Sequence, residues 1–361
     1  MINIQDIFNK SSFEEFNNPL VIYGAGNTGQ AIGEYLTHQG RYIVAFIDQS
    51  ASDGQSYLDK LVLTLDQFLI NFNPSDFDLL VAVHNRDVVM PPLINKLSSC
   101  GFSSVLTMVD YANAFSDDKT FRYWLSPRSI ILEGQHEIQK LYGILADNES
   151  EHWLDSILNF RMTGDYSLLP TPDTANQYVP QDLRRWSNPL RFIDCGAYNG
   201  DTIELLLANG YNIDRLLAFE PDLENFEQLA VKFPDIDHAF LPCGVSSKNG
   251  LVNFAMGSGE GSHQITEGGV SVQVVRIDDV MPLFSPNLIK MDVEGGELDA
   301  LQGAKKTISK YKPGMAISLY HKPEDIWSIP LLLESWKLGY QFYVRGHFHS
   351  SFDSVLYALQ P

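Results

Sequence analysis

The sequence predicts an α/β protein with two Rossmann-like units joined by a helical connector. Two stretches, 20–48 and 191–220, carry the same order of strand, glycine turn, helix, strand and terminal acid. This order is typical of a βαβ unit that binds a nucleotide or nucleoside. The pattern changes at Phe115, where a turn-rich and then amphipathic segment separates the two stretches. We therefore expect domains at 1–115 and 191–361, with a helical connector and cap at 116–190.

The composition is that of a globular protein. Of 361 residues, 44% are hydrophobic and 12% are aromatic, which suits a chain that forms a core. The formal net charge of −20 opposes a phosphate backbone, so we expect no nucleic-acid partner. No apolar run approaches the roughly 18–20 residues that cross a membrane. The acidic N-terminus lacks the order of a signal peptide, and the 3 cysteines show no CxxC spacing, so we expect a cytoplasmic protein.

The first glycine turn lies in the N-terminal unit. The run LVIY predicts a short strand, and Gly24, Gly26 and Gly29 follow it with G-x-G-x-x-G spacing before a helix. The next strand ends at Asp48, about twenty residues after the turn, where an acid would accept a ribose diol. These residues form a candidate nucleotide site.

Two further strands, at Leu79–Val83 and Val105–Val109, complete the N-terminal unit. The turn favours a phosphate group without specifying one ligand, so NAD and a nucleotide sugar are both open. The alternative is a unit that binds no ligand and serves in docking or in forming a homo-oligomer.

The connector combines two amphipathic helices with a long loop. HEIQKLYGILAD and EHWLDSILNFRM carry apolar residues at helical spacing, and Ser150 could cap the second helix. A loop rich in Pro, Thr and Asp follows, directly upstream of the second glycine turn. It could cap a site there, although ordinary surface positions are the simpler explanation of its polar residues. The candidate substrate contacts are Arg161, Asp165, Gln177 and Tyr178.

The second glycine turn opens the C-terminal domain. RFIDCGAYNGD predicts a strand that ends in Asp194 and a turn from Gly196 to Gly200. The following strand ends at Glu220, twenty positions after Gly200, where an acid would accept ribose hydroxyls. This order predicts a nucleoside-cofactor site.

Later elements distinguish this domain from a dinucleotide dehydrogenase. LVNFAM and VSVQVVRI predict an inserted β-pair around a Gly-Ser loop. NLIKMDVEGGE predicts a buried strand whose carboxyl end carries Lys290, Asp292 and Glu294, where polar side chains face the crevice of a parallel sheet. A helix from Glu297 to Ser309 is expected next, and a further strand leads to His321. YQFYV with SVLYAL predicts a closing β-pair.

Four features together resemble the FkbM family of class I S-adenosylmethionine-dependent methyltransferases. They are the turn Asp194-x-Gly196-Ala197-x-x-Gly200, Glu220, the run IKMDVEGGE and the run SLYHKPEDIW. The resemblance extends from about residue 120 to 361, and the MDVEGGE run is its most specific part. The N-terminal unit is similar to small Rossmann domains that precede catalytic modules in sugar-modifying enzymes.

The resemblance implies a class I methyltransferase sheet, with a parallel core closed by an antiparallel β-pair. It also implies methyl transfer from S-adenosylmethionine to a hydroxyl of a saccharide, polysaccharide precursor or secondary metabolite. The residues that would bind this donor are Asp194, Gly196, Ala197, Tyr198, Gly200, Asp201, Glu220, Cys243 and Gly244.

For the transfer step, His321 is the first candidate for general base, because an ordinary histidine pKa suits the task. Asp292 is the second candidate, and Lys290 and Glu294 could orient the acceptor. The sequence shows no recognisable metal spacing, so we expect no metal site, although Asp292 and His321 could share a divalent cation.

A second hypothesis places the chemistry in the N-terminal unit. A nicotinamide-linked oxidoreductase or a nucleotide-sugar-binding protein would use Gly24, Gly26, Gly29 and Asp48. Against it, the richest polar cluster lies at the strand ends of the other domain. The connector and the Gly-Ser loop would decide the acceptor, and neither carries a readable pattern.

Overall fold

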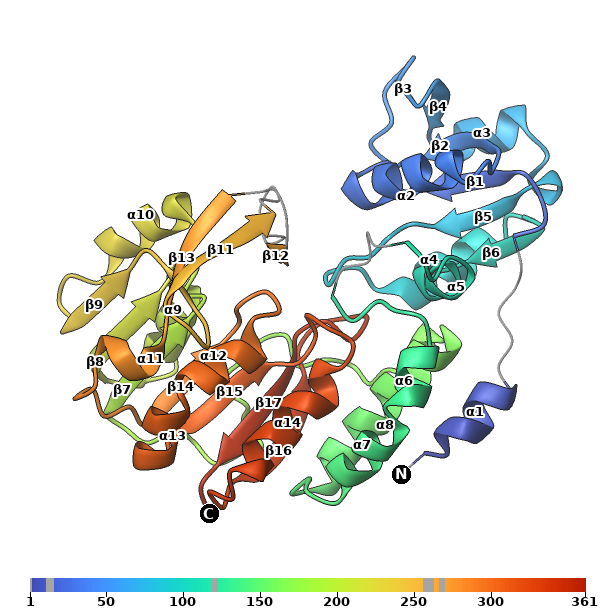
Figure 1. Ribbon diagram of the computed structural model, residues 1–361. Coiled ribbons are helices and arrows are strands. Elements are labelled where there is room, and N and C mark those ends of the chain that lie inside the picture. Colours follow the sequence, from blue (N-terminus) through green and yellow to red (C-terminus); the bar gives the residue numbers. More distant parts are fainter. Residues whose placement is uncertain (1, 11–15, 119–122, 256–262, 266–269) are drawn as a thin grey trace. The chain divides into compact units, whose positions relative to one another are not determined.

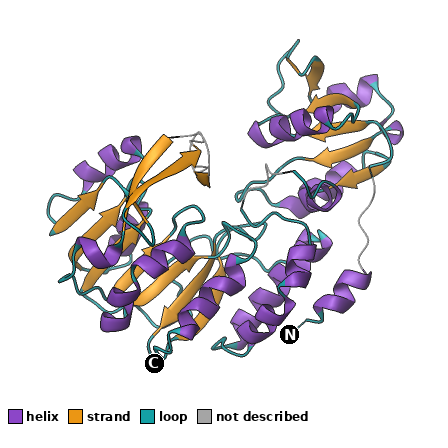
Figure 2. Ribbon diagram, in the orientation of Figure 1, coloured by secondary structure: helices purple, strands orange, loops and turns teal. Residues whose placement is uncertain are grey.

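The computed structural model describes residues 2–10, 16–118, 123–255, 263–265 and 270–361. The chain divides into two compact units, and both are α/β structures (Figures 1 and 2). Unit 1 comprises Met1–Gln135, Trp153–Pro172 and Phe348–Phe352. Unit 2 comprises His136–His152, Asp173–His347 and Asp353–Pro361. The predicted connector segment, 116–190, therefore contributes to both units.

Unit 1 is built on a six-stranded sheet with the order β3-β4-β2-β1-β5-β6. Neighbouring strands run parallel except β3 and β4. The strands are β1 (Leu20–Tyr23), β2 (Ile43–Ile47), β3 (Ser56–Tyr57), β4 (Lys60–Leu63), β5 (Asp78–Val81) and β6 (Ser104–Leu106). The helices are α1 (Ile4–Lys10), α2 (Asn27–His38), α3 (Leu65–Asn71), the short 3₁₀ helix η1 (Pro74–Asp76), α4 (Met90–Ser98), α5 (Met108–Ala114) and α6 (Ser129–Glu133).

The predicted strand at Val105–Val109 is wrong in its second half. β6 ends at Leu106, and Thr107 begins a helix instead. The hydroxyl of Thr107 accepts the backbone N–H of Asp110 at 3.4 Å, and the Asp110 carboxylate accepts the N–H of Thr107 at 2.6 Å. This reciprocal capping box fixes the start of α5 in spite of the β-branched run around it.

Both connector helices are present as α7 (Gln135–Tyr142) and α8 (Asn148–Thr163), followed by the short 3₁₀ helix η2 (Tyr166–Leu168). The cap of α8 differs from the prediction. Ser150 lies inside the helix, and its backbone N–H donates to Asp147 at 2.8 Å. Asp147 is therefore the N-cap of α8, because its carboxylate accepts a backbone N–H that has no partner inside the helix.

Unit 2 contains a seven-stranded sheet with the order β16-β17-β15-β14-β7-β8-β9. The core strands are parallel, and β17 runs antiparallel to both β15 and β16, which confirms the predicted fold class. The strands are β7 (Leu190–Cys195), β8 (Ile213–Phe219), β9 (His238–Leu241), β14 (Leu288–Met291), β15 (Gly314–Ser318), β16 (Gln341–Gly346) and β17 (Ser354–Leu359). The helices are α9 (Asp201–Ala208), α10 (Leu223–Lys232), α11 (Ile277–Val280), α12 (Glu297–Gly303), α13 (Lys305–Tyr311) and α14 (Asp325–Ser335).

A smaller sheet with the order β10-β13-β11-β12 is inserted between β9 and β14. Its strands are β10 (Gly244–Val245), β11 (Gly250–Ala255), β12 (His263–Ile265) and β13 (Val270–Val275). β11 and β13 pair antiparallel, which confirms the predicted β-pair. Apart from β12, the Gly-Ser loop at 258–269 lies outside the described residues.

The predicted helix from Glu297 to Ser309 is divided into α12 and α13. The break follows Gly303, where an added Cβ would lie 2.0 Å from the carbonyl oxygen of Ser246. Only glycine allows this approach of the helix to the β10 segment. The helical period continues through the break in the sequence, so the pattern alone did not reveal it.

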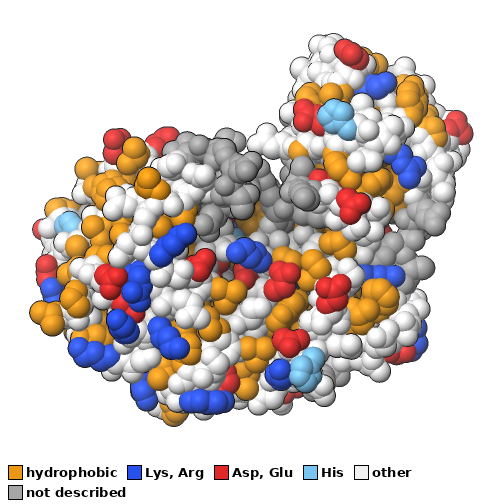
Figure 3. All heavy atoms as spheres, in the orientation of Figure 1, with side chains coloured by type: hydrophobic (Ala, Val, Ile, Leu, Met, Phe, Trp, Pro, Cys, Tyr) orange, Lys and Arg blue, Asp and Glu red, His pale blue; other side chains and the backbone are white. Residues whose placement is uncertain are grey.

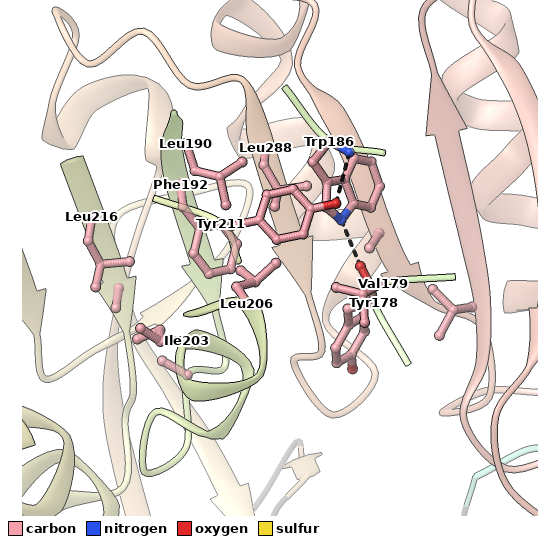
Figure 4. Close-up of a cluster of buried hydrophobic side chains, with 14 of the residues drawn as sticks. Tyr178, Val179, Trp186, Leu190, Phe192, Ile203, Leu206, Tyr211, Leu216 and Leu288 are labelled. Atoms are coloured by element: carbon pink, nitrogen blue, oxygen red, sulfur yellow. Dashed lines mark hydrogen bonds between the residues drawn. The ribbon is translucent and has the colours of Figure 1, made fainter. Parts of the chain in front are cut away.

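One hydrophobic cluster of unit 2 packs the segment before β7 against β7, β8 and α9 (Figure 4). Trp186 fills a space beside Gly314, where a Cβ would lie 2.8 Å from the indole ring. The cluster therefore joins a part of the predicted connector to the core of the sheet.

Candidate active site

Four neighbouring strands of unit 2 end at one edge of the sheet. β8, β7, β14 and β15 are adjacent and parallel. Glu220 follows β8, the Gly196 turn follows β7, Asp292 follows β14, and His321 follows β15 by three residues. The carboxyl ends of parallel strands form the ligand crevice of an open α/β sheet. The topology thus brings most of the predicted site residues to one edge.

The second glycine turn packs closely on β14. Gly196 has φ +77°, and an added Cβ would lie 1.9 Å from the carbonyl oxygen of Asp292. Gly200 has φ +90° and leads into α9, while Tyr198 adopts φ 47° with its side chain partly exposed. The backbone is therefore held in a conformation that favours glycine at two positions. Within the turn, Ala197 is fully buried. Asp201 is the first residue of α9.

Glu220 binds the same turn. One carboxylate oxygen accepts the N–H of Tyr198 at 2.7 Å, and the other accepts the N–H of Asp222 at 2.8 Å. A carboxylate offers about four acceptor positions, so one on each oxygen stays open to a ligand. Burial raises the pKa of Glu220, against the two N–H groups, which lower it. The geometry fits a cofactor that presents two adjacent hydroxyls.

Asp194 and Lys290 form a buried ion pair under the turn. Their side chains are 0% and 4% exposed, and Nζ lies 3.3 Å from the carboxylate and 2.5 Å from the carbonyl oxygen of Gly196. Burial alone would lower the pKa of Lys290, but the charges of Asp194, Asp292 and Asp201 raise it above its ordinary value. Through the bond from Lys290 to Gly196, the pair supports the turn. Direct contact of Asp194 or Lys290 with a ligand stays a prediction.

Asp292 lies at the centre of a polar cluster. Its Oδ2 accepts the hydroxyl of Tyr178 at 2.9 Å. Its Oδ1 lies 3.3 Å from Nε2 of His321 and accepts the hydroxyl of Tyr320 at 3.4 Å. Nδ1 of His321 lies 2.8 Å from fully buried Glu297. The Asp292 side chain is 22% exposed, so it stays partly accessible to solvent while its neighbours hold it.

These charges change the expected roles of Asp292 and His321. Burial alone would lower the pKa of His321, but the carboxylates of Glu297, Glu294 and Asp292 raise it to about 10. Burial alone would raise the pKa of Asp292, but Lys290 and His321 hold it below its ordinary value. These shifts favour a protonated His321 and an ionised Asp292 near neutral pH. The choice between the two residues as general base stays a prediction.

The same cluster is the place where a cation could bind. Among the described residues, one ligand atom each of Asp292, Glu297 and His321 lie within 4.8 Å of one another. Both ring nitrogens of His321 already face carboxylates, however, which a protonated imidazole satisfies without a metal. We assign no metal to this cluster.

Cys243 and Gly244, which follow β9, were expected to bind the donor. Cys243 is buried, which raises the pKa of its thiol to about 11, and Gly244 begins β10. The thiol is therefore protonated and inert at neutral pH. Its contact with the cofactor stays a prediction.

The first glycine turn has its own acid in unit 1. One oxygen of Asp48 accepts the N–H of Ala25 at 2.8 Å. The other accepts both the N–H and the hydroxyl of Ser50, at 2.9 and 2.7 Å. Gly24 has φ +103°, whereas an added Cβ at Gly26 would meet no atom within 4 Å. Gly29 packs so closely that its Cβ would lie 1.9 Å from the carbonyl oxygen of Gly24.

The four connector candidates have different surroundings. Tyr178 alone reaches the cluster of unit 2, through Asp292. Gln177 donates to Asp353 at 2.8 Å. Arg161 is buried in unit 1 and donates to Ser351 at 3.2 Å, and Asp165 accepts the N–H of Ser167 in η2.

Two residues of the cluster escaped the sequence prediction. Glu297 and Tyr320 both lie inside the quoted runs MDVEGGE and SLYHKPEDIW. Glu297 opens α12 and Tyr320 precedes His321, so position in the runs was the available signal.

No helix among the described residues has both the length and the apolar character needed to cross a membrane. On the face drawn in Figure 3, Lys and Arg side chains lie scattered among acidic and apolar ones.

Comparison with known proteins identifies the domain. Residues 194–342 match the family model of the methyltransferase FkbM domain. The hexuronic acid methyltransferase AglP of Haloferax volcanii is 28% identical over 132 residues, which are 34% of this chain and 54% of that relative. The crystal structure of a methyltransferase FkbM from Methylobacillus flagellatus superposes with a TM-score of 0.77 at 24% identity, over 99% of this chain and 93% of that one. The chain therefore carries a methyltransferase domain of the FkbM family and shares the full-length fold of that structure.

Proposed function

We propose that this FkbM-family domain transfers a methyl group from S-adenosylmethionine to a hydroxyl oxygen of a saccharide or a saccharide precursor. The observation that carries the proposal is the shared edge of the unit 2 sheet. There the turn at 196–200 and Glu220 lie at the same edge as Asp292, a partly exposed carboxylate of the polar cluster. The domain family supports the donor, and the relative named as a hexuronic acid methyltransferase supports a sugar acceptor.

The donor site would use the turn and its acid. The open acceptor positions of Glu220 suit the two ribose hydroxyls, because a carboxylate only accepts hydrogen bonds. Tyr198 is 38% exposed, so a ligand can reach this part of the turn. When bound, S-adenosylmethionine supplies a methyl group that is already activated on sulfur.

The acceptor site would use Asp292. The hydroxyl oxygen forms a bond to the methyl carbon, the carbon–sulfur bond breaks, and the hydroxyl proton leaves. A lowered pKa favours the ionised form of Asp292, and its side chain is partly exposed, so it can orient the hydroxyl and accept this proton. Protonated His321 holds Asp292 from the opposite side. Much of the rate would come from this alignment, since holding two reactants in line supplies the larger share of such a step.

Methyl transfer can be tested on the full chain. Tritium-labelled S-adenosylmethionine is incubated with saccharides that contain hexuronic acids and with matched neutral saccharides. We expect label in a saccharide product, and we expect Asp292→Asn to lose transfer while its melting temperature still rises with S-adenosylhomocysteine. The proposal fails if neither S-adenosylmethionine nor S-adenosylhomocysteine raises the melting temperature of the native chain.

The nicotinamide-linked alternative would place the site in unit 1. Asp48 already accepts three hydrogen bonds, two of them on the oxygen that faces Ser50. A ribose diol would have to displace Ser50 from that oxygen. We therefore rank NAD or a nucleotide sugar at the Gly24 turn behind methyl transfer in unit 2.

A further inference from the structure

The segment Asp173–Trp186, which we call the strap, lies before the first residue matched by the family model, 194. It belongs to unit 2, and its first part lies in the predicted loop. Tyr178 on the strap adopts φ +65°. A bulky residue in this left-handed region is strained by about 1–2 kcal/mol, so the surrounding structure must hold it there.

A chain of buried hydrogen bonds holds the backbone N–H of Tyr178. This N–H donates to the hydroxyl of Tyr357 at 2.9 Å. That hydroxyl lies 2.7 Å from Nε2 of His347, and Nδ1 of His347 lies 2.8 Å from the carbonyl oxygen of Asp173. A carbonyl only accepts, so Nδ1 carries the ring proton and Nε2 accepts the hydroxyl of Tyr357. The relay thus starts and ends on the strap.

Trp186 binds the other backbone polar group of Tyr178, its carbonyl oxygen. Its indole Nε1–H donates to the carbonyl oxygen of Tyr178 at 2.7 Å, and its backbone N–H donates to the hydroxyl of Tyr211 at 3.2 Å (Figure 4). Both polar groups of the strained residue are therefore bonded to buried side chains. This arrangement fixes the direction in which the Tyr178 side chain leaves the backbone.

The side chain of Tyr178 ends at the polar cluster. Its hydroxyl donates to Oδ2 of Asp292 at 2.9 Å, and its ring lies 5.4 Å from Nζ of Lys290. On the other oxygen of Asp292 lies His321. The carboxylate is thus held between a strand-end histidine and a tyrosine from outside the matched region.

We propose that Tyr178 is a positioning residue of the methyl-transfer site and that the strap is part of this site. This inference rests on the function proposed above. The Tyr178 hydroxyl sets the orientation of Asp292 toward the acceptor, and the relay through Tyr357 and His347 keeps Tyr178 in its strained conformation. A purely structural tyrosine would need only its ring, which packs in the hydrophobic cluster of Figure 4.

The first test reads Asp292 directly and needs no acceptor. The full chain is labelled with [¹³Cγ]aspartate, and the Asp292 carboxylate signal at pH 7 is assigned with Asp292→Asn. We expect Tyr178→Phe to shift this signal, because the carboxylate loses a charge-assisted hydrogen bond. The matched control is Tyr340→Phe, which removes a buried hydroxyl that donates to the carbonyl oxygen of Pro313 at 2.8 Å rather than to the strap or Asp292, and it should leave the signal in place.

The second test separates positioning from stability. With an accepted saccharide, Tyr178→Phe should lower kcat about 10- to 100-fold, the range of one lost catalytic alignment. KM for S-adenosylmethionine and the melting shift with S-adenosylhomocysteine should stay within about twofold, since Glu220 and the turn are unchanged. Tyr340→Phe should keep kcat.

The inference is overturned if Tyr178→Phe leaves both the Asp292 signal and kcat unchanged. If Tyr178→Phe does not fold, the native chain and Asp292→Asn are labelled with [¹³Cζ]tyrosine, and the Tyr178 signal is compared between them. The Tyr178 signal must then shift in Asp292→Asn, and an unshifted signal overturns the inference. Loss of S-adenosylhomocysteine binding in the native chain would instead contradict the proposed function, so the two failures are distinguishable.

Discussion

In each glycine turn a backbone N–H donates to the acid at the end of the next strand, but the two acids differ in what they can still accept. In unit 1 the N–H of Ala25 donates to Asp48, and in unit 2 the N–H of Tyr198 donates to Glu220, at 2.8 and 2.7 Å. Glu220 then accepts one further N–H on its other oxygen, whereas Asp48 accepts two bonds there from Ser50. Only Glu220 keeps an open position on each oxygen. Two similar glycine turns therefore do not form equivalent ligand sites.

The ends of the neighbouring strands also differ between the two turns. The second turn packs against the end of β14, where Asp292 begins the polar cluster. Gly24 in the first turn approaches the carbonyl oxygen of Ala82, which follows β5. The turn supplies a place for a ligand, and the ends of the neighbouring strands supply the chemistry.

The largest predicted effect is a loss of stability when a side chain is added at the second turn. Gly196→Ala adds a Cβ 1.9 Å from a backbone oxygen at φ +77°, and we expect a loss of about 3 kcal/mol or more in the free energy of unfolding. Gly26→Ala, which meets no atom within 4 Å, should change it by less than about 1 kcal/mol. Urea unfolding of both variants measures the contrast, and equal losses would refute this assignment of the packing.

The next effect concerns the two acids. Glu220→Gln replaces an acceptor-only group by one that carries donors, so we expect S-adenosylhomocysteine affinity to fall about 100-fold, as for two weakened bonds to a charged group. Asp48→Asn should leave this affinity unchanged. Isothermal titration of the two variants checks the pair. A comparable loss in Asp48→Asn would move the donor site to unit 1.

A third prediction uses pH. The folded-state pKa of His321 is raised to about 10, so its protonated form stabilises the fold fully below the unfolded pKa of about 6.5 and loses this effect as pH rises toward 10. The stability difference between the native chain and His321→Gln should therefore shrink between pH 7 and pH 10.

His347→Gln is the control for this prediction. Burial lowers the pKa of His347, so this histidine is neutral throughout that range, and its stability difference should stay constant. Urea unfolding at three pH values gives both series. A constant difference for His321→Gln would show that the carboxylates around it do not hold its proton.

The smallest effect is expected from nucleotides offered to unit 1. NAD and UDP-glucose at millimolar concentration should change the melting temperature by less than about 1 °C, because Asp48 lacks the second open acceptor position. A larger rise that disappears in Asp48→Asn would make the first turn a true nucleotide site.

Most of the fold was predictable because its signals are local. Alternation, glycine turns and terminal acids gave both sheets, and the closing β-pair followed from the runs after His321. The errors arose where one side chain or one packing contact overruled the pattern. Thr107 with Asp110 ended β6 early, and Gly303 against Ser246 divided a helix.

The site was predictable only in part, because its chemistry depends on distances between strands. The order of motifs gave Glu220, Asp292 and His321, but not the charges around His321 that keep it protonated. Glu297 was overlooked because a carboxylate at a helix start is common without a function. Tyr178 was only one of four equal candidates, since nothing in its sequence indicates the relay that directs it.

The most direct test of this account is the structure of the chain with S-adenosylhomocysteine and UDP-glucose offered together. We predict that S-adenosylhomocysteine lies along the turn at 196–200. Both of its ribose hydroxyls should donate to Glu220, and its sulfur should face Asp292. Density for that ligand at the Gly24 turn, or its absence from both turns, would contradict the account.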